Sequence, residues 1–349
     1  MSALRQSDLH QSDRQPGGEV QPKPAPGPGA PSRGPIHVAG MARAGTSWVA
    51  EMLRAAGGFV HLNEPFNPKR PPGQSPGILN APVKVGYVYV ADHNADVFGP
   101  ALRDTFRFRY RHLAEVRQNH TWFDLAKMAK YSAAFTMGAL RGKRPLLDDP
   151  YASLAAPWIA EQFDGQVALL VRHPAAMVAS YRKLGYRAHF RHFLDQPALM
   201  ADHLEPWRAE MEALVETEDR VAQVATFWTV LHRVLFEMAD GSDRVHVVRY
   251  EDLCADPVGE YERLFTRMGL EFNGSARAEV VAGTQGSSKN QSHRWRISRH
   301  GGLSRTAFRP MDSKSMIWAW KKTIEPDEAD RIRAIAGPIG ERYYGDADW

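Results

Sequence analysis

Short apolar runs alternate with longer amphipathic stretches from about residue 35 onward. Residues 167–171 form a continuous apolar run, which is typical of a strand buried on both faces of a parallel sheet. Shorter runs at 36–39, 145–149 and 245–248 predict further strands. Strands that alternate with helices indicate an α/β fold, so we expect a central, mainly parallel sheet flanked by helices.

The stretches between these runs carry the helical period. Residues 46–56 place Val49, Met52 and Leu53 on one face and end at two glycines. Residues 83–90 look extended, and residues 61–68 are rich in turn-forming residues. Further helices are predicted at 151–162, from 174 onward, and at 203–215, 218–239, 256–268 and 326–336, with a helical and aromatic segment at 101–140.

A glycine-bracketed loop joins the first predicted strand to the first predicted helix. Gly40 and Gly45 permit positive φ, and Thr46 or Ser47 is expected to cap the helix with its hydroxyl. Backbone N–H groups that converge at a helix N-terminus form an anion cradle. The order is close to the triphosphate loop G-x-x-x-x-G-K-[ST], but Thr46 replaces the lysine and the cation of the loop is Arg43. This charge placement suits a 5′-phosphate without a γ-phosphoryl group, and the alternative is an ordinary βα turn.

A second candidate binding segment follows the apolar run at 167–171. Arg172 stands at the carboxyl end of that strand, where open α/β sheets bind ligands. Pro174 opens the next helix, and Ser180 lies about two helical turns beyond Arg172. A planar guanidinium and a hydroxyl suit the oxygens of a phosphate, whereas the alternative is a strand-end salt bridge.

Composition narrows the class of protein. The 349 residues include 44 Lys and Arg against 40 Asp and Glu, and this net charge of +4 fits an anionic ligand but is too small to indicate nucleic acid. A single cysteine, Cys254, excludes an internal disulfide and a multi-cysteine zinc site, which fits a reducing cytoplasm. No run approaches the ~20 apolar residues of a membrane span, so we expect a soluble protein, and with the cysteine count a cytoplasmic one. Residues 1–34 are predicted to be a disordered, Pro/Gly-rich leader, and residues 35–349 a single domain.

Together these segments resemble the sulfotransferases that use 3′-phosphoadenosine 5′-phosphosulfate (PAPS), a P-loop-related family with bacterial, tyrosylprotein and carbohydrate members. The loop at 40–48 resembles the family's 5′-phosphosulfate loop, and residues 170–180 resemble its 3′-phosphate motif. Residues 248–257 resemble a supporting strand-to-helix segment, and residues 318–344 resemble the C-terminal helix. The resemblance implies a P-loop-like three-layer fold and transfer of a sulfuryl group to a small-molecule, lipid or glycan acceptor. It also implies that residues 101–140 form a helical insertion beside the acceptor pocket.

The resemblance also implies roles for individual residues. Arg43 would stabilise the leaving oxygen, and Glu64 matches the place of the catalytic base in tyrosylprotein enzymes, with His61, Asp148 and Asp149 as alternatives. No metal is required. The expected PAPS-binding residues are Arg43, Ala44, Gly45, Thr46, Ser47, Trp48, Arg172, Ser180, Arg294 and Arg296.

Two other functions stay open at the level of sequence. A P-loop kinase would need the lysine that Thr46 replaces and a magnesium-binding carboxylate, for which only Asp148 or Asp149 is available. A non-catalytic nucleotide-binding protein would keep the fold and the phosphate contacts without turnover. The basic residues at 286–309, which include Arg294 and Arg296, could bind the donor or could form a solvated loop, because a charged loop needs no ligand.

Overall fold

The computed structural model describes residues 34–71, 75–284 and 312–349, all within one compact unit. Its centre is a five-stranded sheet in the order β2-β3-β1-β4-β5, and every pairing is parallel. The strands are β1 (Ile36–Gly40), β2 (Phe59–Asn63), β3 (Arg144–Asp148), β4 (Gln166–Val171) and β5 (Val245–Arg249). Because the strands are parallel, their carboxyl ends lie along one edge of the sheet.

The connections of the two central strands run in opposite directions. From β1 the chain continues to β2 at one edge of the sheet, and from β4 it continues to β5 at the opposite edge. Between β1 and β4, Ile36 is opposite Gln166 and Gly40 is opposite Leu170, so the two strands end nearly level. This is a topological switch point, where open α/β sheets bind ligands.

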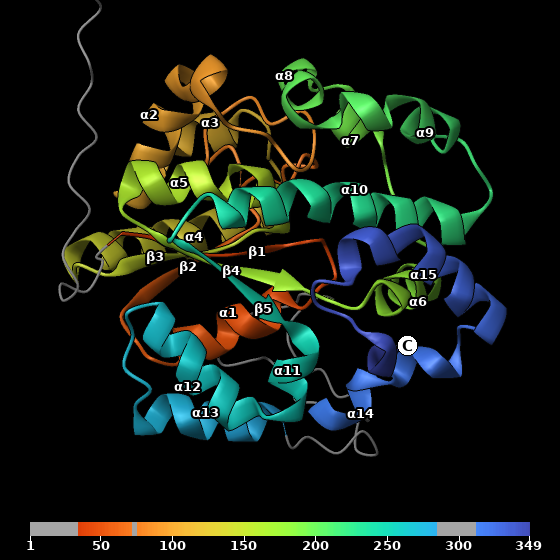
Figure 1. Ribbon diagram of the computed structural model, residues 1–349. Coiled ribbons are helices and arrows are strands. Elements are labelled where there is room, and N and C mark those ends of the chain that lie inside the picture. Colours follow the sequence, from red (N-terminus) through yellow and green to blue (C-terminus); the bar gives the residue numbers. More distant parts are fainter. Residues whose placement is uncertain (1–33, 72–74, 285–311) are drawn as a thin grey trace, which may run out of the picture. The chain divides into compact units, whose positions relative to one another are not determined.

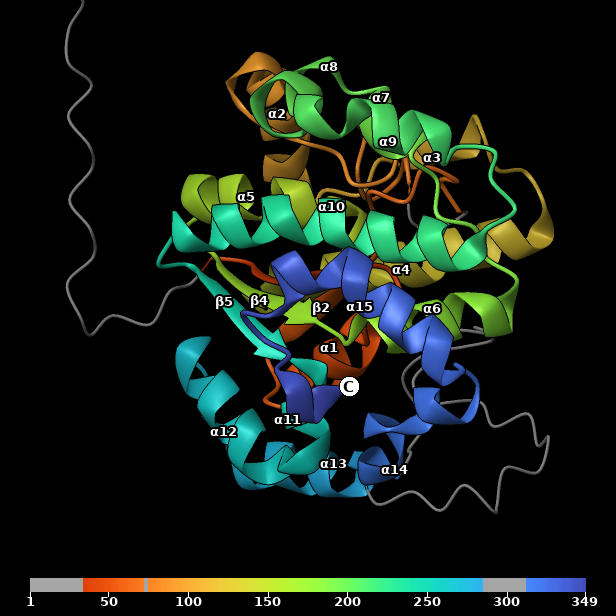
Figure 2. The same ribbon diagram turned by 45° about the vertical axis from the view of Figure 1, so that its right-hand side comes forward.

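Alternate residues of β4 supply two separate cores. Val167, Leu169 and Val171 pack with α10 (Arg220–Asp240), whereas Ala168 and Leu170 pack with α1 (Thr46–Arg54) and α12 (Pro257–Arg267). Figures 1 and 2 show α10 and α5 (Ala156–Phe163) on one face of the sheet, and α1, α12 and α13 (Gly274–Thr284) on the other. The prediction of a three-layer α/β fold is confirmed.

The other helices complete the layers. A third core covers β2 and β3 with residues from α2 (Ala95–Phe106) and α4 (Trp122–Leu140). The remaining α-helices are α3 (His112–Val116), α6 (Pro174–Leu184), α7 (Arg191–Leu194), α8 (Pro197–Leu199), α9 (Arg208–Ala213), α11 (Tyr250–Ala255), α14 (Ser313–Ile317) and α15 (Pro326–Gly340).

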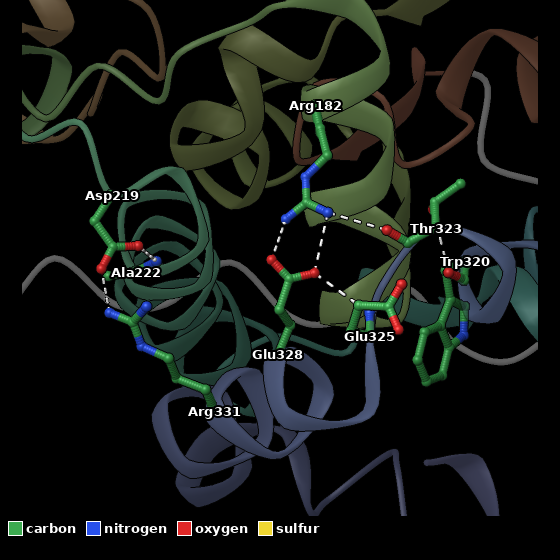
Figure 3. A network of polar contacts seen from close by, with 8 residues as sticks. All are labelled: Arg182, Asp219, Ala222, Trp320, Thr323, Glu325, Glu328 and Arg331. Atoms are coloured by element: carbon green, nitrogen blue, oxygen red, sulfur yellow. Dashed lines mark hydrogen bonds and ion pairs between the residues drawn. The ribbon is translucent and has the colours of Figure 1, made fainter.

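The C-terminal helix α15 is joined to α6 and α10 by polar contacts (Figure 3). Arg182 of α6 donates to both carboxylate oxygens of Glu328, at 2.6 and 3.0 Å, and to the carbonyl of Thr323 at 3.0 Å. Arg331 pairs with Asp219, whose other oxygen caps α10 by accepting from the N–H of Ala222. These pairs are partly exposed, so each stabilises the fold by at most about 1 kcal/mol, and their main effect is to orient the helix.

Several local predictions were wrong. Residues 61–68 were read as a turn-rich segment, but β2 occupies Phe59–Asn63 and the turn begins only at Glu64. Residues 83–90 form no strand; Val83, Val88 and Val90 are buried as part of the third core. The stretch 203–215 is divided among the end of a π-helix (Met200–Leu204), a 3₁₀ helix (Glu205–Trp207) and α9, and residues 150–155 are a 3₁₀ helix before α5.

The predictions of a disordered leader and of no membrane span concern residues that the structure describes only in part. The leader at 1–34 is described only at Gly34, so its disorder and the domain boundary remain predictions. Within the described ranges, no helix is both long and apolar enough to cross a membrane.

Candidate active site

Three of the predicted site residues follow three different strands of the sheet. Arg43 follows β1, Glu64 follows β2, and Arg172 follows β4. Because all carboxyl ends lie along one edge, the fold gathers these side chains although more than a hundred residues separate Arg43 from Arg172. The candidate site is therefore built along this edge.

The glycine loop adopts the conformation that its glycines permit. Gly45 has φ 113° and is the N-cap of α1, and its carbonyl accepts from the N–H groups of Trp48 and Val49 at 3.0 and 3.2 Å. Neither Thr46 nor Ser47 caps the helix with its hydroxyl, which corrects that prediction. A Cβ on Gly45 would lie 2.9 Å from the ring of Tyr250, so the backbone can pass there only as glycine.

Free backbone donors line the start of α1. Within the described part of the chain, the N–H groups of Gly45, Thr46 and Ser47 make no hydrogen bond to protein. The positive end of the helix dipole coincides with these three donors. The loop thus has the polar groups that an anion cradle requires.

Two buried hydroxyls hold the loop from outside. The Ser153 Oγ accepts from the N–H of Gly40 at 2.7 Å, and the Tyr87 hydroxyl accepts from the N–H of Ala42 at 2.9 Å. Tyr87 is buried with φ 55°, an unusual conformation for a bulky residue. Burial raises its pKa well above the usual value, and the neighbouring hydroxyl of Tyr181 adds to the rise. Sequence reasoning missed both residues, because only the tertiary structure brings them to the loop.

Arg172 connects the two candidate phosphate segments. Its Nη1 donates to the carbonyl of Arg43 at 3.2 Å, and its guanidinium lies 4.3 Å from the centre of the Tyr250 ring. Its Nε is buried without a hydrogen-bond partner among the described residues. The guanidinium is therefore positioned by the carbonyl and the ring while part of its donor capacity remains unused. Ser180 follows in α6, partly buried.

Glu251 fixes the strand ends next to Arg172. Its carboxylate accepts from the N–H of His173 and from the hydroxyl of Tyr344, both at 3.0 Å. Burial raises its pKa, although these hydrogen bonds and the charge of Arg172 oppose the rise. The His173 ring stacks on Trp320 at 5.0 Å, and burial, with Arg249 and Lys321 nearby, lowers its pKa to about 3. A neutral, enclosed His173 acts here as a packing residue.

Glu64 lies at the turn after β2 with φ 47°. Its N–H donates to the carbonyl of Asp148 at 2.8 Å, and its carboxylate accepts from the side-chain amide of Asn67 at 2.8 Å. Burial raises the pKa of the Glu64 carboxyl; the Asn67 hydrogen bond and the positive charge of Arg43 lower it, and Asp148 raises it. A carboxylate with a raised pKa within the field of a cation has the properties of a general base near neutral pH.

The alternative bases differ in how far they are already engaged. Both carboxylate oxygens of Asp149 accept backbone hydrogen bonds, from Phe66 at 2.6 Å and from Tyr151 at 2.9 Å, and the residue is fully buried. Asp149 therefore holds the turn rather than facing an acceptor. Asp148 is also buried and lies 3.4 Å from Nε2 of the half-buried His61, so these two side chains form a pair.

The remaining predicted residues divide into two groups. The indole of Trp48 is buried and packs edge-on against Tyr250 and Tyr261 at 5.4 and 5.6 Å, so its side chain belongs to the core. Arg294 and Arg296 lie outside the described residues. No group of three or more metal-ligating side chains occurs in the ranges that the structure describes.

Two surface cavities, of about 150 and 360 Å³, lie beside α2 and α3. Arg111 contributes to the lining of the smaller, and Arg70 and Arg117 to that of the larger. Neither is lined by Arg43, Glu64 or Arg172, so these cavities are separate from the strand edge. A role of residues 101–140 at the acceptor pocket remains a prediction.

The chain belongs to the sulfotransferase family, whose family model matches residues 35–274. It is therefore a sulfotransferase, an enzyme that transfers a sulfuryl group, and not an ATP phosphotransferase. A search of curated protein sequences finds no significant match.

Among solved structures, the chain is similar to a sulfotransferase domain from the curacin biosynthetic pathway, with 15% identity and a TM-score of 0.45 over 86% of this chain and 96% of that one. It is also similar to a sulfotransferase domain of an olefin synthase from Synechococcus, with 14% identity and a TM-score of 0.41 over 93% and 99%. A mouse sulfotransferase complexed with PAP has 14% identity and a TM-score of 0.39 over 90% and 87%.

Proposed function

We propose that this enzyme transfers the sulfuryl group of PAPS to a hydroxyl of a small-molecule, lipid or glycan acceptor. Arg43 and the loop N–H groups would act on the 5′ side of the donor, Arg172 and Ser180 would hold its 3′-phosphate, and Glu64 would serve as base. The family supports the reaction type. The identity of the donor, the acceptor class and the residue roles are our proposal.

The residues present fit a donor that carries two separate anionic groups. The loop offers three free N–H groups at the start of α1, which suits one anion. Arg172, which is partly exposed, lies at the end of the neighbouring strand and suits a second. When bound, PAPS would supply a sulfuryl group whose bond to a 5′-phosphate oxygen breaks during transfer.

Arg43 would stabilise the negative charge that develops on the leaving oxygen. It is exposed, has φ 81°, and lies in a loop that Ser153 and Tyr87 hold in place. Preorganised donors of this kind are worth roughly 100 to 1000-fold in rate. The backbone N–H groups of Gly45, Thr46 and Ser47 would add to the same field.

Glu64 would take the proton of the acceptor hydroxyl as its oxygen attacks sulfur. The carboxylate must be ionised for this step, and the charge of Arg43 favours the ionised form while burial opposes it. The resulting pKa lies above that of an ordinary glutamate, which improves the match between base strength and neutral pH.

The observation that carries the proposal is the hydrogen bond from Arg172 to the carbonyl of Arg43. It joins the 5′ loop to the proposed 3′-phosphate residue across the switch point between β1 and β4. One bisphosphorylated nucleotide can therefore engage both segments, whereas two unrelated anion sites would not need this contact.

Calorimetry with 3′,5′-adenosine bisphosphate, followed by transfer of labelled sulfate from PAPS to an acceptor panel, tests the proposal. We expect bisphosphate to bind more tightly than ATP with magnesium, and label to appear on a hydroxyl-bearing acceptor. Absence of bisphosphate binding would contradict the donor assignment. Binding without transfer to any acceptor in extracts of the source organism would instead favour a non-catalytic nucleotide-binding protein.

A further inference from the structure

The helix α4 exposes the residues that a surface helix normally buries. Its buried side chains are Asp124, Met128 and Phe135, together with Gly138, which packs so closely on β2 that a Cβ would lie 2.4 Å from Val60. The exposed stripe recurs at helical spacing and is apolar throughout: Trp122, Ala126, Ala129, Ala133, Met137 and Leu140.

This stripe, called here the outer face of α4, is strongly exposed at its two ends. The Trp122 side chain is 87% exposed and that of Leu140 is 76% exposed. Phe123 and Leu125 are exposed beside the stripe, and Leu113 of the preceding helix α3 is 78% exposed. An amphipathic surface helix directs polar residues outward, so an apolar outer face indicates a surface that is covered by another phase or molecule.

The segment that contains α3 and α4 is basic. Residues 107–143 contain eight Lys and Arg against two Asp and Glu, a net charge of +6, while the whole chain carries +4, which leaves the rest of the chain at −2. Both acidic residues, Glu115 and Asp124, are buried and accept backbone hydrogen bonds. The basic side chains without an ion-pair partner in the described structure are Arg107, Arg117, Lys127, Lys130, Arg141 and Lys143.

The lysines accompany the aromatic rings of the helix. The Lys127 Nζ lies 4.7 Å from the centre of the Phe123 ring, and the Lys130 Nζ lies 5.6 Å from that of Tyr131. Exposed Trp, Phe and Leu beside Lys is a residue set that also occurs in helices lying in a membrane interface. At 1.5 Å per residue, the 19 residues of α4 form a face about 28 Å long.

We propose that the outer face of α4 docks the enzyme on an anionic lipid surface, with the helix lying in the plane of the interface. A second copy of this chain is the less favourable occupant, because two such faces would bring like positive charges together without acidic partners. A lipid surface supplies both an apolar phase for Trp122, Met137 and Leu140 and negative headgroups for the basic margin. The proposal concerns the outer face of α4 and does not depend on the identity of the acceptor.

Vesicle co-sedimentation of the full chain tests the proposal. The probes are phosphatidylcholine vesicles with and without 30% phosphatidylglycerol. We expect binding to the anionic vesicles, about tenfold weaker binding to the neutral ones, and a marked loss in 0.5 M salt because the Debye length shortens. The double variant Trp122→Gln/Leu140→Gln should weaken binding to anionic vesicles at least tenfold. The double variant Lys127→Gln/Lys130→Gln should weaken this binding by about fivefold for each lysine replaced.

Trp318→Gln is the matched control, because Trp318 is also exposed, at 42%, but lies outside α4. This variant should bind vesicles like the unmodified protein, and circular dichroism with bisphosphate calorimetry checks that each variant is folded. Equal binding by the Trp122/Leu140 variant would overturn the proposal, as would no binding to anionic vesicles at low salt. A dimer in sedimentation velocity that this variant abolishes, without vesicle binding, would assign the face to a second copy instead.

Discussion

The guanidinium of Arg172 donates a hydrogen bond to the backbone carbonyl of Arg43 across 3.2 Å. The contact links the end of β4 to the glycine loop after β1, and the ring of Tyr250, which follows β5, lies under the same guanidinium at 4.3 Å. Three strand ends thus share one arginine. The positions of the two proposed phosphate sites are therefore coupled through Arg172.

Replacement of Arg172 and of Arg43 should have different kinetic effects. Arg172→Ala should weaken binding of 3′,5′-adenosine bisphosphate by about 10 to 150-fold, because a hydrogen-bonded charge pair contributes roughly 1.5–3 kcal/mol. Arg43→Ala should chiefly lower kcat, by about 100 to 1000-fold. Calorimetry and initial rates separate the two effects. Arg277→Ala, an exposed arginine on α13, should change neither, and equal losses of affinity in both site variants would contradict the assigned roles.

Glu64→Gln should lower kcat/KM by about 100 to 10,000-fold and remove the acidic limb of the pH–rate profile. The base must be ionised, and burial raises its pKa in the folded protein, so the wild-type rate should fall as the pH drops through a value above 4.5. Asp148→Asn should keep the limb and move it to lower pH, because Asp148 raises the pKa of Glu64. A limb that persists in Glu64→Gln and disappears in Asp148→Asn would transfer the role to Asp148.

Tyr87→Phe should destabilise the protein by about 1–3 kcal/mol, because the N–H of Ala42 would lose its buried acceptor. Urea unfolding measures the change in the free energy of unfolding. Tyr343→Phe is the matched control; it also removes a tyrosine hydroxyl, but one without a hydrogen-bond partner in the described ranges, and should change stability by less than about 0.5 kcal/mol. Similar losses in both variants would show that the Ala42 contact has no special effect.

The buried His232 should reduce stability in mildly acidic solution. Burial lowers its pKa to about 4, whereas the unfolded value is 6.5, so the unfolded chain binds the proton first and stability falls as the pH drops from 6.5 toward 4. Between these values this residue should contribute a loss of about 1.4 kcal/mol per pH unit. His232→Phe keeps a ring against Trp228 and removes the titration.

Urea unfolding of both proteins at pH 7, 6, 5 and 4.5 measures the difference. The variant should gain stability relative to the unmodified protein as the pH falls, while the contributions of the other histidines cancel. A difference that is independent of pH would contradict the assignment of His232 as a neutral, buried group.

The local sequence pattern was sufficient to predict strands and loops whose conformation depends on neighbouring residues alone. The apolar run at 167–171 has few alternatives to a buried parallel strand, and Gly40 and Gly45 mark a loop in which both glycines have the positive φ that glycine adopts easily. The strand at Phe59–Asn63 was missed because it is short, alternates buried with half-buried positions, and runs directly into turn-forming residues. Residues 83–90 were predicted to be extended, and they form no strand, because burial without strand pairing leaves the same apolar signal.

The sequence by itself determined the fold class and the strand-end positions of Arg43 and Arg172, because these positions follow from the order of strands and helices. The family and the place of Glu64 came from the resemblance, since the strand before Glu64 was missed. The tertiary structure decided which residues hold the glycine loop and its neighbours in place. Ser153, Tyr87 and Tyr250 reach the loop from segments 45 to more than a hundred residues away, and no spacing rule encodes such contacts. It also decided that α4 turns Trp122 and Leu140 outward, since this helix carries apolar residues on more than one face and its neighbours choose which face is buried.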